Sequence, residues 1–253
     1  MPDKKIVAIG GGENGRPGYP YETFEIDKRI VELTNKNNPK LLFLGTATSD
    51  SELYFEVISK NFGQFGCITD NLALTKINYS REELENKIFS ADIIYVGGGN
   101  TKMMLDIWCE NEVDKLLLQA YEKGIVLSGL SAGSLCWFSY CNSDSLKITS
   151  ESDELILLKG LGLIDCMHCP HYDVEADRKE SLKEMMKNLD GYVAVALENC
   201  VALEIITGKY RIIKGDTSKK GYKTYWLNGK YIEKEIVCEE EYGDLNELIH
   251  IER

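Results

Sequence analysis

Residues 125–133 read IVLSGLSAG, and this stretch decides how the rest of the chain is interpreted. The apolar run Ile125–Ser128 predicts a buried strand, and the motif Gly129-Leu-Ser131-Ala-Gly133 follows it directly. Glycines at both ends of a G-x-S-x-G motif permit a tight strand-to-helix turn that projects the serine from the end of the strand. A serine that merely caps a helix in a glycine-rich turn would have the same letters. The preceding strand favours a nucleophile at Ser131.

Short apolar strands and amphipathic helices alternate on the N-terminal side of this motif. Strands are expected at Lys5–Gly10, Leu41–Gly45, Asp70–Leu74 and Asp92–Gly97, with helices at Phe24–Asn35, at Glu52–Phe62, from Arg81 and from Thr101. Nearly continuous apolar strands between helices predict a mostly parallel sheet with helices on both faces.

The C-terminal side is less regular. It predicts a helix at Val174–Asn188, successive antiparallel strands at Val193–Leu197, Val201–Ile206 and Tyr210–Lys214, and a hairpin at Thr224–Lys230. Because no repeat or linker divides the chain, one domain over residues 1–253 is expected.

The composition excludes several classes of partner. The chain has 253 residues, 43% of them hydrophobic, and a net charge of −12. Such a surface repels nucleic acid and anionic lipid. Neither a secretory signal nor a membrane-spanning apolar stretch is visible, so a cytoplasmic protein with reduced cysteines is expected. The pair in Cys166-Met-His-Cys169 lacks a second pair at zinc spacing, which favours core cysteines over a metal site.

Only three histidines can supply the base that an activated serine needs. His250 lies in a charged C-terminal segment, and His168 lies in an apolar, strand-like stretch where it could point into the core. His171 follows Pro170 at the end of that strand, and the carboxyl ends of strands are where sites assemble in α/β proteins. His171 is therefore the predicted base.

The acid that would orient this histidine is less clear, because 41 acidic residues compete. Glu198 ends the apolar strand Val193–Leu197, which places a carboxylate at another strand end. A solvated glutamate in a turn would look the same. Asp144, in Asn142-Ser-Asp-Ser145, is a second candidate.

The loop Gly97-Gly-Gly-Asn100-Thr101 also follows a strand and precedes a helix. Its glycines, including Gly98 and Gly99, permit close backbone approach to a ligand, and Asn100 can cap the helix. A backbone N–H from this loop could complete an oxyanion hole with the N–H of Ala132. Phosphate binding at the same helix start is the alternative.

Gly10, Gly12 and Gly15 match the letters of a dinucleotide-binding fingerprint. The loop Arg16–Pro20 follows them where that fingerprint requires a helix. We therefore interpret this segment as a wall of the cleft around Ser131.

Four segments occur together and in this order: Gly97-Gly-Gly-Asn-Thr101, Gly129-Leu-Ser-Ala-Gly-Ser134, Cys169-Pro-His-Tyr-Asp173 and Ala196-Leu-Glu-Asn199. Together they resemble the peptidase E family of serine peptidases, which includes the cyanophycinases. The resemblance extends from the first strand to about Ile213. It implies a three-layer α/β/α sandwich with a mostly parallel central sheet, similar to class I glutamine amidotransferases, with antiparallel strands near the C-terminus.

The same resemblance assigns roles to residues. It implies Ser131 as nucleophile, His171 as base and Glu198 as the third member, with Asp144 also important and Gly98 and Ala132 as oxyanion donors.

In members that cleave dipeptides with an N-terminal aspartate, an arginine on the helix after the histidine binds the aspartate side chain. Arg178 is the only arginine on Val174–Asn188, although the helix begins sooner after His171 here.

The resulting hypothesis is hydrolysis of short peptides through an acyl-enzyme, with substrate contacts at Arg178, Gly99 and Asn100. It requires no cofactor and no metal, and its partner is a small peptide, with the protein a monomer or a homodimer. One alternative is an α/β-hydrolase esterase whose base is His250. The other is a non-catalytic protein that binds a small molecule.

Overall fold

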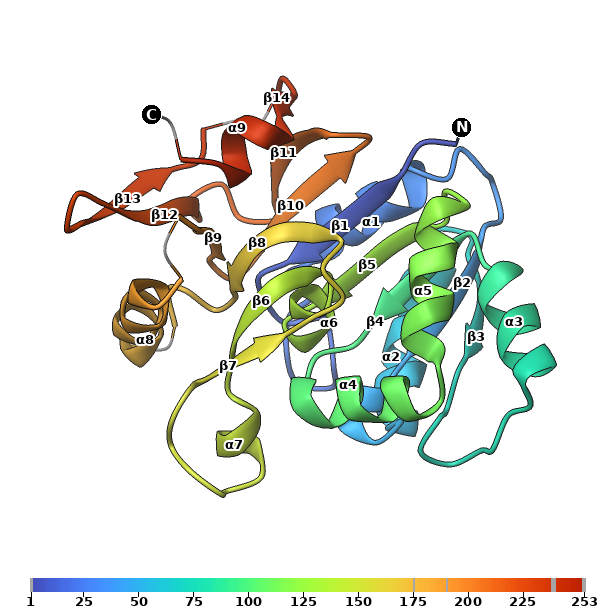
Figure 1. Ribbon diagram of the computed structural model, residues 1–253. Helices are drawn as coiled ribbons and strands as arrows, with labels where there is room; N and C mark the ends of the chain where they lie inside the picture. Colours follow the sequence, from blue (N-terminus) through green and yellow to red (C-terminus); the bar gives the residue numbers. More distant parts are fainter. Residues whose placement is uncertain (1, 175, 190, 238–239, 252–253) are drawn as a thin grey trace.

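The fold is mixed α/β with two sheets, as shown by a computed structural model that describes residues 2–174, 176–189, 191–237 and 240–251 (Figure 1). The first sheet contains β1 (Lys5–Ile9), β2 (Lys40–Leu44), β3 (Ile68–Asn71), β4 (Ile93–Val96), β5 (Val126–Leu130), β10 (Val201–Ile206), β11 (Lys209–Lys214) and β14 (Gly243–Asp244). Its order is β14-β11-β10-β1-β5-β4-β2-β3. Strands β1 to β5 are parallel to one another, and β10, β11 and β14 extend the sheet with antiparallel pairing.

Helices cover both faces of the parallel strands. The helices are α1 (Phe24–Glu32) and α2 (Glu52–Gly63) on one face, and α3 (Arg81–Phe89), α4 (Thr101–Glu110) and α5 (Val113–Glu122) on the other. Alternation along β1 explains the two layers, because Val7 and Ile9 pack with α1 and α2 whereas Ile6 and Ala8 face the other core. The predicted helical cover of a parallel sheet is present.

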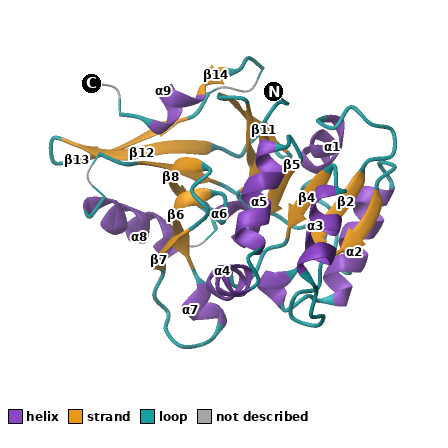
Figure 2. Cartoon of the chain, turned by 45° about the vertical axis from the view of Figure 1, so that its right-hand side comes forward, coloured by secondary structure: helices purple, strands orange, loops and turns teal. Residues whose placement is uncertain are grey.

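The C-terminal half builds a second sheet with the order β13-β12-β9-β8-β6-β7. Its strands are β6 (Phe138–Ser143), β7 (Ile156–Lys159), β8 (Ile164–Cys169), β9 (Val193–Leu197), β12 (Gly221–Leu227) and β13 (Lys230–Glu235). One face, with Cys166 and Val195, shares the core of α3 to α5. The other face packs against Leu182 and Met186 of α8 (Ala176–Lys187), which Figure 2 shows on the outer side of this sheet. The remaining helices are short: η1 (Thr46–Thr48), α6 (Ala132–Leu135), α7 (Ser145–Ile148) and α9 (Leu245–Ile249).

One predicted pairing is wrong. Strands β9 and β10 follow each other in sequence, but they belong to different sheets, with β9 between β8 and β12 and β10 beside β1. Cys200 separates them with a φ of 61°, a left-handed conformation that redirects the chain. The predicted pairing of β10 with β11 and the hairpin of β12 and β13 are both present.

The two sheets meet around the carboxyl end of β1. The N–H groups of Ser131 and His171 donate to the carbonyls of Ile9 and Gly10, and the N–H of Cys200 donates to the carbonyl of Gly11. Residues from three separate parts of the chain are thereby attached to one short backbone segment. Within the described ranges, no helix is both long and apolar enough to cross a lipid bilayer.

Candidate active site

Ser131 lies in a tight turn between β5 and α6, with φ 56° and ψ −113°. Glycines make this turn possible by allowing backbone segments to touch. A Cβ on Gly133 would lie 2.1 Å from the carbonyl oxygen of Val96, and a Cβ on Gly129 would lie 2.3 Å from the carbonyl oxygen of Gly133. A positive φ at a residue other than glycine costs free energy and is found at functional sites more often than elsewhere. The conformation directs the Ser131 side chain away from the strand.

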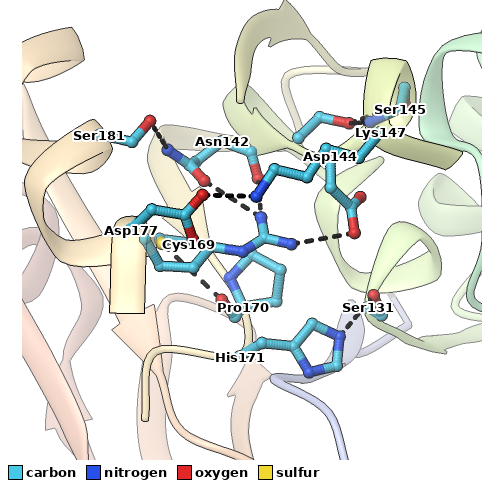
Figure 3. A network of polar contacts seen from close by, with 12 residues as sticks. Ser131, Asn142, Asp144, Ser145, Lys147, Cys169, Pro170, His171, Asp177 and Ser181 are labelled. Carbon is cyan, nitrogen blue, oxygen red and sulfur yellow. Dashed lines mark hydrogen bonds and ion pairs between the residues drawn. The ribbon is translucent and has the colours of Figure 1, made fainter. Parts of the chain in front are cut away.

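His171 contacts both the serine and an amide side chain. Its Nε2 lies 2.8 Å from Oγ of Ser131 (Figure 3), and its Nδ1 lies 2.7 Å from Oδ1 of Asn199. An amide oxygen can only accept, so Nδ1 carries the proton and donates to Asn199. Nε2 is then free to accept the hydroxyl proton of Ser131, which is the tautomer that a general base requires.

Asn199 is held by a residue from the segment that also carries the histidine. Its backbone N–H donates to Oδ1 of Asp173 at 2.9 Å, and the other carboxylate oxygen of Asp173 lies 2.5 Å from Nζ of Lys219. Partial burial alone would raise the pKa of Asp173, but the hydrogen bonds from Lys219 and Asn199 outweigh it and lower that pKa. Asp173 is therefore ionised at neutral pH and fixes the loop that presents Asn199.

Gly11 closes the opposite side of this contact. A Cβ at position 11 would lie 2.2 Å from Oδ1 of Asn199 and 2.4 Å from Nδ1 of His171. The bare backbone of Gly11 therefore lies against the hydrogen bond between these side chains. The interpretation of this glycine-rich segment as a wall of the cleft agrees with that placement.

Glu198 does not contact His171. Its carboxylate accepts from the backbone N–H of Lys220 at 2.8 Å and from the hydroxyl of Tyr222 at 3.3 Å, so it lies toward β12. The expectation that Glu198 orients the imidazole is corrected in favour of its neighbour Asn199. Adjacent side chains along a strand point in opposite directions, so Asn199 faces the imidazole and Glu198 faces away from it.

Asp144 does not contact His171 either, and forms an ion pair with Arg178 instead. Its Oδ2 lies 3.1 Å from Nη2 of Arg178, and Nη1 of the same arginine donates to the carbonyl of Asn142 at 2.8 Å. Figure 3 shows the Asp144 carboxylate in the same region as Ser131 and His171. Its side chain is 22% exposed, whereas that of Arg178 is fully buried. In this conformation Arg178 is not accessible to a substrate carboxylate, contrary to the expectation for a substrate contact.

The predicted oxyanion donors lie beside the serine. Ala132 is the first residue of α6, where backbone N–H groups have no partner within the helix. A Cβ on Gly98 would lie 3.4 Å from Cβ of Ser131, so the triple-glycine loop lies next to this serine. The N–H of Gly98 donates to the hydroxyl of Tyr54 at 3.1 Å, a contact that the sequence did not predict.

Gly99 and Asn100 have different positions in this loop. Gly99 has φ 134° and lines an open pocket of about 610 Å3 together with Gly98, Leu130 and Tyr54. Further lining residues are Gly12, Glu13, Asn14, Arg16, Pro17, Tyr19, Thr48, Ser51, Leu53 and Val57. The Asn100 side chain is buried, where it accepts from the N–H of Met103 and caps α4. Asn100 is thus a capping residue here, and Gly99 borders the space beside Ser131.

The other two histidines do not contact Ser131. His168 is buried, with Nδ1 2.8 Å from the carbonyl of Val195 and Nε2 2.9 Å from Oγ of Ser134. Burial lowers its pKa to about 4, although the bond to Val195 partly opposes this, so the ring is neutral near pH 7. His250 is exposed at the end of α9, and its Nδ1 lies near the carbonyl of Asn246.

The cysteines of β8 are core residues, as the sequence predicted. Cys166 and Cys169 are both buried, and burial raises the pKa of Cys166. Among the residues that the structure describes, no group of three or more histidine, cysteine or acidic side chains could hold a metal ion.

The sequence reasoning missed Asn199, Gly11, Asp173 and Tyr54. Asn199 follows Glu198 directly, and an amide can orient a histidine in place of a carboxylate, but the sequence does not show which of the two side chains faces the imidazole. Asp173 lies two residues after His171, but its role depends on a loop contact across 26 residues. Tyr54 lies on α2, and no local pattern connects that helix to the triple-glycine loop.

Comparison with known proteins identifies the family. The model of peptidase family S51 matches residues 5–213. The "Uncharacterized peptidase YgaJ" of Bacillus subtilis is 32% identical over 224 residues, which cover 88% of this chain and 91% of that protein. Peptidase E of Shewanella denitrificans is 26% identical over 215 residues, covering 80% and 84% of the two chains. The fold resembles the crystal structure of a peptidase from an acI-B1 Actinobacterium, with a TM-score of 0.65, 17% identity, and coverage of 95% and 96%. The chain belongs to peptidase family S51 and is a serine-type peptidase.

Proposed function

We propose that the protein hydrolyses short peptides through an acyl-enzyme formed on Ser131. The observation that carries the proposal is the continuous contact from Ser131 through His171 to Asn199, with both hydrogen bonds shorter than 3 Å. Nε2 takes the hydroxyl proton as the oxygen attacks the scissile carbonyl, and then returns a proton to the leaving amine. Water repeats the sequence on the ester and releases the acid.

Three features support the individual roles in this nucleophilic mechanism. The left-handed turn at Ser131 has the form of a nucleophile elbow. Asn199 fixes the imidazole tautomer without adding a negative charge. The N–H of Ala132 at the start of α6 lies where negative charge is favoured, and we propose it as a donor to the oxyanion with the triple-glycine loop.

The proposed substrate is a small peptide, and we propose that it is not restricted to an N-terminal aspartate. The buried ion pair between Arg178 and Asp144 argues against free access of a substrate carboxylate to that guanidinium. The open pocket beside Gly99 is lined by Leu53, Tyr54 and Val57 among others, which favours a residue with an apolar side chain.

The wider setting is also proposed. We propose a single domain over residues 1–253, supported by a core cluster that joins residues of both sheets. A three-layer sandwich related to class I glutamine amidotransferases is proposed for the central part. We also propose that the protein acts in the cytoplasm as a monomer or homodimer, without nucleic-acid or membrane partners. The net charge of −12 supports the lack of these two kinds of partner.

A panel of dipeptides tests the proposal: Asp-Leu, Ala-Leu, Glu-Leu, Arg-Leu and Leu-Leu, each with the wild type and with Ser131→Ala. We expect turnover that does not depend on aspartate and that falls by several powers of ten in the variant. Full activity of Ser131→Ala would reject the mechanism, and a strict requirement for Asp-Leu would reject the proposed specificity.

A second pair of variants tests the base. His171→Ala should lose activity and His250→Ala should retain it. The reverse result would favour an esterase of the α/β-hydrolase type.

A further inference from the structure

We propose that the hydroxyl of Tyr54 is a hydrogen-bond donor in the oxyanion hole and acts beside the N–H of Ala132. The inference rests on the proposed acyl-enzyme mechanism and adds a side chain to it. Tyr54 lies on α2, far in sequence from the triple-glycine loop and from the serine, and neither the motifs nor the family comparison assigns it a role.

The position of Tyr54 is fixed by three contacts. Its hydroxyl accepts from the N–H of Gly98 at 3.1 Å. Its ring lies edge-on to Phe43, with the ring centroids 5.1 Å apart. The ring also packs against Gly97, where an added Cβ would lie 2.8 Å from Cε1 of Tyr54. Because the ring cannot move without leaving this packing, the hydroxyl is held in place before a substrate arrives.

The same hydroxyl is bonded to a residue that lies next to Ser131. Gly98 touches the nucleophile, as shown by the 3.4 Å between a Cβ at position 98 and Cβ of Ser131. Tyr54, Gly98 and Leu130, the residue that precedes Ser131, line the same pocket. We place the oxygen of a carbonyl carbon bonded to Oγ on the side of this loop, as part of the proposal.

The proton of the Tyr54 hydroxyl is available for a hydrogen bond to the oxyanion. A tyrosine hydroxyl has one proton to donate and can also accept. The bond from Gly98 uses the acceptor side, and no acceptor for the proton occurs among the described residues. An O–H that accepts a hydrogen bond becomes a stronger donor, since chains of hydrogen bonds polarise one another. The N–H of Gly98 would thus act on the oxyanion through the Tyr54 hydroxyl.

The protonation state suits this role. Burial raises the pKa of Tyr54 to about 12, although the bond from Gly98 partly opposes this. The hydroxyl therefore keeps its proton throughout the neutral and mildly alkaline range, and no general base is needed to prepare it.

A competing interpretation makes the opposite prediction. Suppose that the N–H of Gly98 itself contacts the oxyanion. The Tyr54 hydroxyl would then compete for this N–H, and removing the hydroxyl would free the N–H for the oxyanion. Tyr54→Phe would then keep or increase turnover. Under our proposal the same variant loses a donor, and turnover falls.

The test compares Tyr54→Phe with Tyr95→Phe in the full-length protein. Tyr95 belongs to the same aromatic cluster, and its buried hydroxyl has no hydrogen-bond partner in the described structure, so it is a matched control. We expect kcat of Tyr54→Phe to fall by about 10²-fold with KM within about twofold, as for loss of one oxyanion donor. Tyr95→Phe should match the wild type, and both variants should unfold at wild-type urea concentrations.

A second readout separates this inference from the proposed function. The rate of Ser131 labelling by a fluorophosphonate should fall in Tyr54→Phe and vanish in Ser131→Ala. If the wild type is labelled and cleaves peptides, and Tyr54→Phe does both at the same rates, the role of Tyr54 is overturned. The serine mechanism would then remain intact. A wild type that neither labels nor cleaves any peptide would reject both.

Discussion

Nδ1 of His171 lies 2.7 Å from the amide oxygen of Asn199, and the carboxylate of the adjacent residue Glu198 lies toward β12. The side chain that contacts Nδ1 of the proposed base is therefore neutral. An amide whose oxygen faces Nδ1 can fix the tautomer, as in Cys-His-Asn sites, but it would offer no charge to the imidazolium of the proposed attack. The geometry of the serine site is thus complete without a buried anion next to the histidine.

Replacing Asn199 tests this arrangement directly. Asn199→Ala should lower kcat by about 10²-fold, because the imidazole loses the partner that holds its tautomer. Asn199→Asp should retain more activity than Asn199→Ala, and the acidic limb of its pH–rate profile should move to higher pH because a carboxylate favours the protonated ring. Rates measured from pH 5 to pH 9 check both outcomes. Equal activity of all three proteins would show that Asn199 does not orient the base.

Gly11 should tolerate no side chain. In Gly11→Ala the new Cβ would overlap Oδ1 of Asn199 and Nδ1 of His171, so their hydrogen bond must break or the loop must move. We expect activity to fall by at least about 10²-fold. Gly63→Ala is the control, since its Cβ meets nothing within 4 Å at the end of α2. Turnover and circular dichroism of both variants distinguish a local effect from unfolding, and an active Gly11→Ala protein would contradict the close contact.

The ion pair of Arg178 should contribute to stability. Asp144→Asn removes the carboxylate and leaves a fully buried guanidinium with less compensation, at a cost of about 3 kcal/mol in the free energy of unfolding. Asp106→Asn breaks an exposed pair with Lys102 and should cost much less, because exposed ion pairs contribute little to stability. Urea denaturation gives both values. Similar costs for the two variants would mean that the Arg178 pair behaves like one in solvent.

Asp27 predicts a distinct dependence of stability on pH. The residue is fully buried on α1, and its Oδ2 accepts from the hydroxyls of Tyr21 and Thr23. Burial raises its pKa to about 7, against these hydrogen bonds, so the folded protein holds the proton more tightly than the unfolded chain does. Its stabilising contribution is therefore present below about pH 4 and is lost as the pH rises through 7.

The variant Asp27→Asn isolates this group. The pH-dependent contributions of the other groups cancel when the free energy of unfolding of the variant is compared with that of the wild type. The two proteins should have similar free energies of unfolding near pH 4. At pH 8 the variant should be more stable, by on the order of 4 kcal/mol at most. Asp153→Asn, at an exposed position, is the control. A constant difference for Asp27→Asn would mean that the carboxyl is ionised throughout this range.

The parallel sheet and the position of the serine could be predicted from sequence because both depend on local patterns. An apolar run that ends in glycine, such as Ile125–Gly129, predicts both a buried strand and the tight turn at its carboxyl end. The scarcity of histidine led to His171. Asn199 could not be preferred over Glu198, because the choice depends on which side chain of two neighbours faces the imidazole.

The separation of β9 from β10 into two sheets was equally hidden. Both strands are apolar and only three residues, 198–200, lie between them, which is typical of a hairpin. The left-handed conformation of Cys200 redirects the chain, but a cysteine gives no sequence signal for it. Contacts of β9 with β8 and β12, from distant parts of the chain, decide the outcome.

Ser131 follows a strand of the first sheet, whereas His171 and Asn199 follow β8 and β9 of the second. The alignment of the Ser131 hydroxyl with the His171 imidazole therefore depends on how the two sheets pack together, and not only on the structure of each sheet. A slip that leaves every strand and helix intact would still separate oxygen from imidazole. Inactivation by urea should accordingly precede loss of the far-ultraviolet circular dichroism signal, and coincident curves would show that docking and folding are a single transition.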